Sequence, residues 1–252
     1  MSEWNPEAYL KFKQQRTQPA LDLARRVQGD DPKTIADIGC GPGNSTATLR
    51  NVFPHAKIIG IDNSPSMIEK ARASYPETEF LLCDAASLPG TYDLLFSNAC
   101  LQWIPDHHTL IPHLMTKLNA GGALAVQVPM NGEEPLYRII REVAAEKKWG
   151  FDKIKLETNE TLQPNGYFDI LGTASNRFDM WETVYTHAMP SHEHLLDWVR
   201  STRLRPYLDA LDEESGRAFE GEILRRVREV YPVMQSGEVL LRFRRFFFVA
   251  YR

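Results

Sequence analysis

The sequence predicts an α/β fold: a doubly wound, mostly parallel β-sheet that ends in a C-terminal antiparallel hairpin with a helical cap inserted into it. Three observations lead to this fold class. Short apolar runs alternate with helix-like segments through the first half of the chain, which is typical of a parallel sheet with helices on both faces. A glycine-rich turn, Gly39-Cys40-Gly41-Pro42-Gly43, follows the first of these runs. The second half holds two further strand-like runs, Phe178–His187 and Val239–Tyr251, with helical stretches between them.

The elements of the first half follow from the alternation of apolar and amphipathic segments. The predicted strands are Thr34–Ile38, Lys57–Ile61, Glu79–Cys83, Tyr92–Ser97 and Ala123–Val128. The predicted helices are Asn44–Phe53, Pro65–Ser74, His108–Leu118 and Leu136–Lys148. Asn119-Ala120-Gly121-Gly122 predicts a helix stop and a tight turn. Because parallel sheets bind ligands at the carboxyl ends of their strands, the polar residues that follow these strands are the candidate site.

The length and composition fit one large domain, or one domain with an insertion: the chain has 252 residues, of which 43% are hydrophobic and 25% are charged. We expect an N-terminal lid helix within residues 1–30 and a nucleoside-binding core over residues 31–188. We expect a helical cap insertion over residues 189–237, with helices near His192–Arg200 and Gly216–Val230. Residues 238–252 are predicted to close the core sheet.

Charge and cysteine usage exclude several classes of partner. The formal net charge is −4 and no long basic run is present, which disfavours nucleic acid. No apolar stretch of about eighteen residues occurs, and the N-terminus lacks a signal-like pattern, so we expect no membrane partner. Cys40, Cys83 and Cys100 lack disulfide or metal-ligand spacing, which indicates reduced thiols and no metal site. We expect a cytoplasmic protein, and a monomer.

The glycine-rich turn and a later acid predict a nucleoside-binding half-site. Glycines let a ligand approach the backbone closely, and Asp62, which ends the second apolar run, can accept hydrogen bonds from ribose hydroxyls. The spacing is G-x-G-x-G, not the G-x-G-x-x-G of dinucleotide sites, and Pro42 removes one backbone N–H donor. The turn therefore favours a cofactor without phosphate over a nicotinamide cofactor. A glycine turn that merely connects a strand to a helix remains the alternative.

The segment Asp37–Gly43 resembles the first motif of the class I S-adenosylmethionine-dependent methyltransferases, which have a Rossmann-like fold. Later segments continue the resemblance in order: Asp62-Asn63-Ser64-Pro65-Ser66-Met67, Asp84-Ala85-Ala86, and Tyr92–Asn98 followed by Leu101-Gln102-Trp103. The resemblance implies S-adenosyl-L-methionine as the cofactor and S-adenosyl-L-homocysteine as the product. The residues it implies for cofactor binding are Asp37, Gly39, Cys40, Gly41, Asn44, Asp62, Asn63, Met67, Asp84, Ala85, Asn98, Leu101 and Trp103.

In that family the glycines flank the amino-acid part of the cofactor, and an acid at the position of Asp62 holds the ribose. By the same resemblance, Met67 lies near the adenine and Asp84 accepts from its amino group. Asn98 is implied to lie at the methionine end of the cofactor, with Leu101–Trp103 near the transferred methyl group.

Arginines in the second half indicate an anionic substrate. Arg200, Arg203 and Arg205 cluster within the predicted cap, and arginine binds carboxylates bidentately. A carboxylate nucleophile is already ionised at neutral pH, so we expect no catalytic base. A solvated helix end is the alternative for these arginines. The N-terminal residues Trp4, Tyr9 and Arg16 are expected to act as a lid, with a helix that serves only packing as the alternative.

A narrower resemblance, to the trans-aconitate methyltransferases, extends over nearly the whole chain. It is carried by Trp4-Asn5-Pro6, Asp37–Ser45, Asn98–His107, Met189-Pro190-Ser191-His192, Asp197-Trp198-Val199 and Leu204-Arg205-Pro206. It implies methylation of one carboxylate of trans-aconitate to a monomethyl ester. The expected substrate-binding residues are Trp4, Tyr9, Arg16, Trp103, His187, Arg203 and Arg205. A different small or carrier-bound acid, or a cofactor-binding module without turnover, are the alternatives.

Overall fold

The computed structural model describes residues 13–153 and 161–252, which fall into two compact units. Of the described residues, the core unit comprises 14–129, 161–183 and 245–252. The cap unit comprises residue 13 and residues 130–153 and 184–244. Two long strands, β6 (Arg177–Met189) and β7 (Val239–Tyr251), contribute residues to both units.

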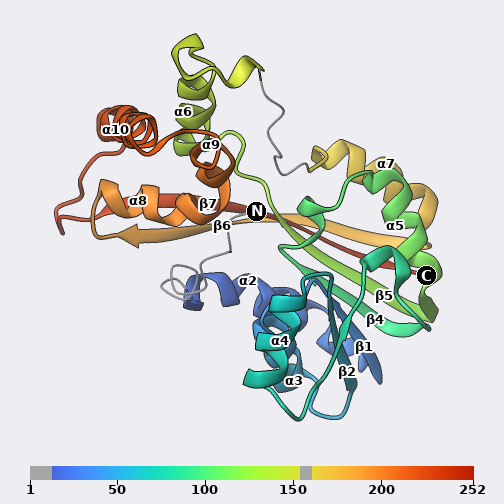
Figure 1. Ribbon diagram of the computed structural model, residues 1–252. Coiled ribbons are helices and arrows are strands. Elements are labelled where there is room, and N and C mark those ends of the chain that lie inside the picture. Colours follow the sequence, from blue (N-terminus) through green and yellow to red (C-terminus); the bar gives the residue numbers. More distant parts are fainter. Residues whose placement is uncertain (1–12, 154–160) are drawn as a thin grey trace. The chain divides into compact units, whose positions relative to one another are not determined.

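One seven-stranded sheet has the order β3-β2-β1-β4-β5-β7-β6 (Figure 1). The remaining strands are β1 (Thr34–Ile38), β2 (Lys57–Asp62), β3 (Glu79–Leu82), β4 (Tyr92–Asn98) and β5 (Leu118–Pro129). β1 to β5 pair in parallel, and β7 pairs antiparallel to β5. The strand order reverses between β1 and β4, and such a switch point is where sheets of this kind bind ligands. The predicted fold class is confirmed.

The central strands are buried along most of their length. In β4, Leu94, Leu95 and Phe96 follow one another and are all at most 1% exposed. Consecutive apolar residues are typical of a parallel strand that is covered on both faces, since successive side chains point to opposite sides. The covering helices of the core unit are α2 (Lys13–Arg26), α3 (Asn44–Val52), α4 (Pro65–Ser74), α5 (His107–Thr116) and α7 (Pro164–Ala174).

Local capping sets where several of these helices begin. Ser64, with extended backbone, precedes Pro65 at the first position of α4, where a missing N–H costs no hydrogen bond. Asp106 caps α5, since its side chain accepts a hydrogen bond from the N–H of Thr109. Both helices therefore begin within a residue of the predicted position.

The predicted turn at residues 119–122 is wrong, because β5 begins at Leu118 and runs through these residues. A Cβ on Gly122 would lie 3.0 Å from the carbonyl oxygens of Asn119 and Asp93. The glycine thus permits a close backbone approach within the sheet, and the register between β4 and β5 shifts in this region, between Tyr92 and Leu94.

The cap unit has its own apolar core. Between β6 and β7 the chain forms α8 (His192–Val199), a π-helical turn over Arg200–Leu204, α9 (Arg205–Leu208) and α10 (Glu213–Val230). Together with α6 (Pro135–Ala144) these helices enclose a buried cluster, in which Phe219 stacks edge-on against Trp149 and Phe151. An amphipathic helix is stabilised mainly by burial of such a face.

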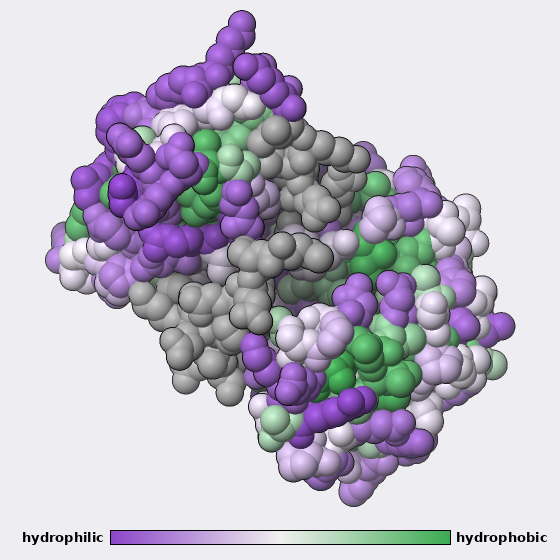
Figure 2. Space-filling model, viewed as in Figure 1, coloured by the Kyte–Doolittle hydropathy of each residue, from purple (hydrophilic) through white to green (hydrophobic). Residues whose placement is uncertain are grey.

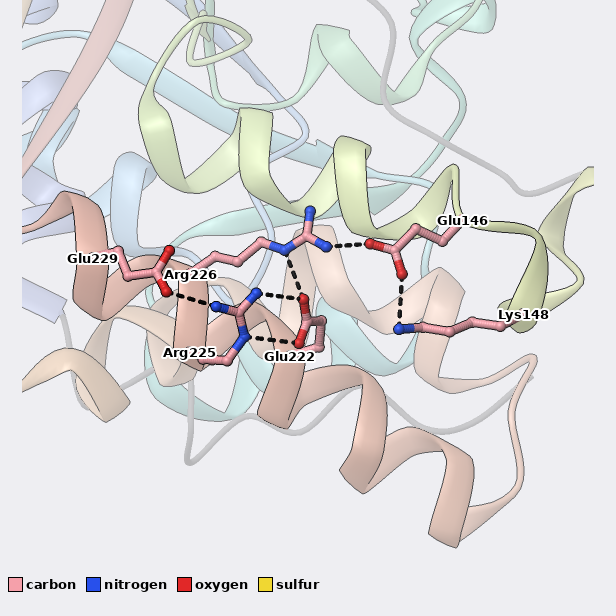
Figure 3. Close-up of polar contacts among 6 residues, drawn as sticks. All are labelled: Glu146, Lys148, Glu222, Arg225, Arg226 and Glu229. Atoms are coloured by element: carbon pink, nitrogen blue, oxygen red, sulfur yellow. Dashed lines mark hydrogen bonds and ion pairs between the residues drawn. The ribbon is translucent and has the colours of Figure 1, made fainter.

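The surface of α10 holds a network of ion pairs (Figure 3). Glu222 pairs with Arg225 and Arg226, and Arg226 also reaches Glu146 near the end of α6. Hydrogen bonds from Arg225 and then from Arg226 lower the pKa of Glu222 to about 2. Arginine on this helix therefore serves pairing within the cap unit.

The exposed surface mixes hydrophilic residues with smaller hydrophobic patches (Figure 2). Within residues 13–153 and 161–252, no helix combines the length and apolar character needed to cross a membrane.

Candidate functional site

The glycine-rich turn joins β1 to α3, and its glycines have distinct tasks. Gly39, Gly41 and Gly43 have φ values of 69°, 53° and 92°, a region that favours glycine. A Cβ on Gly39 would clash with the Sγ of Cys100, and a Cβ on Gly43 would lie 2.7 Å from the Tyr75 ring. A Cβ on Gly41 would meet nothing within 4 Å. The turn is therefore packed at both ends and open in the middle, where a ligand can approach the backbone.

Asp62, at the end of β2, holds this turn in place. Its Oδ2 accepts a hydrogen bond from the N–H of Gly41 at 2.9 Å, and its Oδ1 accepts one from the N–H of Ser64 at 2.9 Å. Each carboxylate oxygen has a further lone pair, so two hydroxyl donors can still bind. The sequence predicted a ligand-binding acid here but not its bond to the glycine turn.

Asp37, in β1, is a fully buried carboxylate that is only partly satisfied. Its Oδ2 accepts hydrogen bonds from Ser45 at 2.7 Å and Thr46 at 2.6 Å, both at the start of α3. Its Oδ1 is buried and has no hydrogen-bond partner. Desolvation raises the pKa of Asp37 to about 6. A buried acceptor of this kind is stabilised by a cationic or N–H donor.

A second unsatisfied acceptor lies at the end of β4. Asp37 pairs with Phe96 across the sheet, so Asn98 follows on the same face two residues further along β4. The Oδ1 of Asn98 is buried without a hydrogen-bond partner. The chain then turns sharply at Ala99, which has a φ of 54°. The two acceptors fit a ligand that carries an ammonium group.

The remaining predicted cofactor residues also follow strand ends in the core unit. Asp84 is exposed beyond β3, where its Oδ1 accepts from the N–H of Ala86 at 2.8 Å, and Ala85 beside it is buried. Asn63 is exposed after β2, and Met67 is half-buried in the first turn of α4. The predicted cofactor-binding residues thus surround the carboxyl ends of β1 to β4; their contacts with a ligand stay a prediction.

The two thiols beside the turn are unsuited to nucleophilic chemistry. Burial raises the pKa of Cys100 to about 12 and also raises the pKa of Cys40. Cys40 packs against Ile68 and Phe80 in a small apolar cluster. What Cys40 can offer a ligand is therefore its backbone, because its side chain belongs to the core.

A buried hydrogen-bonded pair fixes the turn after β4, and sequence reasoning missed it. The Nε2 of His107 lies 2.8 Å from the carbonyl oxygen of Leu101, so this nitrogen carries the proton and donates. The Nδ1 then accepts from the Tyr167 hydroxyl at 2.9 Å. His107 is 4% exposed and Tyr167 is fully buried. No sequence signal connects these residues, because 60 positions separate them.

The predicted substrate residues fall into three groups. Trp4 and Tyr9 lie outside the described residues, and of Arg16 only the backbone, within α2, is described. Trp103 is 55% exposed in the short helical turn Leu101–Trp103 of the core unit. His187 belongs to the cap unit, where its ring lies 5.0 Å from that of Trp198. The structure places His187 beside an aromatic side chain of the cap unit, and its contact with a substrate stays a prediction.

The three cap arginines, which the sequence could not tell apart, have different surroundings. Arg200 pairs with Asp197 at 2.5 Å and Glu220 at 2.7 Å. Arg205 pairs with Asp209 at 3.4 Å. The Nε of Arg203 is buried with no hydrogen-bond partner. Arg203 thus has a donor available for an anion, and it lies in the π-helical turn, a feature frequent at functional sites.

Among the described residues, no group of three or more His, Cys, Asp or Glu side chains is placed to hold a metal ion.

Comparisons with known proteins identify the class of protein as a methyltransferase. Residues 35–122, which contain the glycine turn and the ends of β2, β3 and β4, match the methyltransferase domain. Among solved structures, the YcgJ protein from Bacillus subtilis gives a TM-score of 0.56 at 13% identity, covering 87% of this chain and 92% of that chain. Phosphoethanolamine N-methyltransferase 2 from Haemonchus contortus, in complex with S-adenosyl-L-methionine, gives a TM-score of 0.52 at 16% identity. The match covers 86% of this chain and 48% of that chain. At these identities the likeness concerns the fold.

The particular family follows from relatives that match over the full length. Trans-aconitate 2-methyltransferase from Escherichia coli O7:K1 is 43% identical over 258 residues, covering 100% of this chain and 99% of the relative. The enzyme of the same name from Methylobacterium radiotolerans is 44% identical over 256 residues, covering 99% of this chain and 98% of the relative. The chain belongs to the trans-aconitate 2-methyltransferase family. The family predicted from the sequence is confirmed.

Proposed function

We propose that this protein is an S-adenosyl-L-methionine-dependent carboxyl O-methyltransferase that converts trans-aconitate to its monomethyl ester. The observation that carries the proposal is the full-length identity of 43% with an enzyme named for that substrate. The core unit supports it, because its unsatisfied groups match the chemistry of the cofactor.

The fit of the cofactor rests on three features of the core unit. The backbone at Gly41 is open, which suits a close approach by the ligand. The carboxylate of Asp62 has lone pairs for two ribose hydroxyls. The unpartnered oxygens of Asp37 and Asn98 can accept from an α-ammonium group. Asp84 is proposed to accept from the adenine amino group.

When bound, the cofactor supplies an electrophilic methyl group. The chain then has to orient one carboxylate and exclude water. No residue is required as a base, because the attacking carboxylate is ionised at neutral pH. We propose that Arg203, Arg205 and Arg16 bind carboxylates of the substrate, with Arg203 contributing most because its Nε has no partner within the cap unit.

The remaining assignments are proposals as well. Trp4, Tyr9 and Trp103 are proposed to wall the substrate, and His187 to border it. Residues 1–30 are proposed as a lid and residues 189–237 as a cap on a cofactor-binding core formed by residues 31–188 and the closing strand at 238–252. We also propose that the enzyme works as a monomer in the cytoplasm.

Methyl transfer from radiolabelled S-adenosyl-L-methionine to a panel of acids tests the function. The panel is trans-aconitate, cis-aconitate, citrate, isocitrate and a fatty acid. Turnover is expected to be fastest on trans-aconitate. Preferred turnover on the fatty acid would move the substrate to another acid class, and cofactor binding without turnover on any acid would indicate a binding module.

A further inference from the structure

Gln102 is a buried amide whose two ends have different surroundings. It lies in the helical turn Leu101–Trp103, shortly after β4, and is 5% exposed. Its Nε2 donates a hydrogen bond to the carbonyl oxygen of Ala99 at 2.7 Å. Its Oε1 is buried and has no hydrogen-bond partner among the described residues. A buried amide oxygen of this kind is destabilising unless a ligand supplies a donor or a positive charge.

The bond to Ala99 fixes the orientation of this amide. A carbonyl oxygen only accepts hydrogen bonds, so the atom of Gln102 that lies 2.7 Å from it has to be the Nε2 donor. Ala99 is itself held in place, because its N–H donates to the carbonyl oxygen of Gln127 on β5 at 2.9 Å. The Oε1 of Gln102 is therefore directed away from the Ala99 carbonyl.

Gln102 adds a third unpartnered acceptor to those of Asp37 and Asn98, all within the core unit. Asp37 belongs to β1 and Asn98 ends β4, whereas the turn that holds Gln102 packs against β5. β1, β4 and β5 are successive strands of the sheet (Figure 1). Two strand spacings are about 10 Å. One ammonium nitrogen joins acceptors at most about 6 Å apart. Asp37 and Gln102 therefore call for different donors.

The proposed cofactor has a second cationic group that can serve Gln102, and the proposed acceptor acid has none. A tricarboxylate that is ionised at neutral pH carries no N–H or O–H group, so it cannot satisfy an amide oxygen. S-adenosyl-L-methionine carries a sulfonium besides its α-ammonium group, and the C–H groups on a sulfonium are polarised, weak donors. The α-ammonium suits Asp37 and Asn98, which leaves the sulfonium for Gln102.

We propose that the Oε1 of Gln102 faces the sulfonium and its methyl group, and that this contact favours binding of S-adenosyl-L-methionine over S-adenosyl-L-homocysteine. The inference rests on the proposed function and deepens it, because it adds a cofactor-binding residue to the same site. S-adenosyl-L-homocysteine has a neutral sulfur without a methyl group, so the dipole of the amide attracts only the methylated form. Gln102 thereby limits inhibition by the product.

The Kd values of two matched variants test this role. Gln102→Met and ionised Gln102→Glu both lose the hydrogen bond to Ala99, but only Gln102→Glu keeps an acceptor. In Gln102→Met, the Kd for S-adenosyl-L-methionine is expected to rise about fivefold, while that for S-adenosyl-L-homocysteine changes less than about twofold. In Gln102→Glu, the preference for S-adenosyl-L-methionine is expected to be at least that of wild type. Calorimetry measures both values for each protein.

The ratio of the two Kd values separates ligand contact from structural support. Gln163→Met is the control, because Gln163 is an exposed glutamine of the core unit, and its ratio is expected to equal that of wild type. An equal rise of both Kd values in Gln102→Met, or the same ratio in Gln102→Met and Gln102→Glu, would overturn the proposal. If Gln102→Met does not fold, Gln102→Lys takes its place, since a cation there should weaken binding of the sulfonium ligand more than that of the thioether.

The binding data for wild type keep this inference distinct from the proposed function. A wild-type protein that binds neither ligand would overturn the proposed function, and the role of Gln102 with it. A wild-type protein that binds both ligands, with an unchanged ratio in every variant of Gln102, would refute only the role of Gln102.

Discussion

The polar groups of the core unit and those of the cap unit are organised in opposite ways. Around the glycine turn, a few buried groups are held by short local bonds and keep unsatisfied acceptors, as in Asp37 and Asn98. On α10 of the cap, exposed charges pair with one another, as Glu222 does with Arg225 (Figure 3). Exposed ion pairs change the free energy of folding little, whereas burying a polar group without a hydrogen bond is destabilising. Buried unsatisfied groups are therefore the better guide to a binding site.

The largest expected effect concerns Asp62. Asp62→Ala removes the acceptor for the Gly41 and Ser64 N–H groups and the proposed acceptor for ribose. We expect the Kd for S-adenosyl-L-homocysteine to rise about 100-fold or more, measured by calorimetry. Asp169→Ala, an exposed carboxylate on α7, serves as the control. An unchanged affinity would break the assignment of the core unit as the cofactor site.

A pair of cap arginines sharpens the contrast between satisfied and unsatisfied groups. Arg203→Gln is expected to raise KM for trans-aconitate about tenfold, because it removes a donor that has no partner within the cap unit. Arg200→Gln removes a cation already paired with Asp197 and Glu220 and is expected to leave KM within about twofold. Steady-state kinetics measure both KM values. An equal rise in KM for the two variants would contradict a special role for Arg203.

Acidification is expected to weaken cofactor binding through Asp37. Its pKa is raised to about 6 by burial, so the free protein protonates this carboxyl as the pH falls through 6. An ammonium donor needs the carboxylate, so affinity should fall by up to about tenfold per pH unit below 6. The Kd for S-adenosyl-L-homocysteine is measured by titration between pH 5 and 8, in steps of about half a pH unit. Asp37→Asn should remove the pH dependence.

The same group has an opposite effect on the unliganded fold. Because the folded pKa lies above the ordinary value of 3.8, the folded protein binds more protons between these two values. The contribution of Asp37 to stability is therefore complete below about pH 4 and is lost as the pH rises through about 6. Denaturant titrations of wild type and Asp37→Asn across this range check the sign.

The smallest effect is expected at the pair behind the turn that carries Trp103. Tyr167→Phe leaves the Nδ1 of His107 without its donor, and the free energy of unfolding should fall by about 1–3 kcal/mol. Because His107 also holds the Leu101 carbonyl, kcat should fall a few-fold while cofactor affinity is kept. A stability loss with unchanged kcat would limit the pair to a structural role.

Local patterns explain which parts of the site could be predicted. The glycine turn, Asp62 and the start of α4 depend on residues within a few positions of one another, so spacing sufficed. His107 and Tyr167, by contrast, are 60 positions apart, and no local pattern connects them. The cap arginines share one segment and differ only in their partners, which the sequence does not order. Contacts between distant segments were thus the part that required the structure.

A competition experiment tests the proposed substrate. The enzyme receives labelled S-adenosyl-L-methionine and an equimolar mixture of trans-aconitate, cis-aconitate, citrate, isocitrate and a fatty acid. Mass spectrometry then identifies the labelled product. We expect the label in a monomethyl ester of trans-aconitate, with S-adenosyl-L-homocysteine formed in equal amount. Label in another acid of the mixture, or no labelled ester from a protein that binds the cofactor, would show that trans-aconitate is not the substrate.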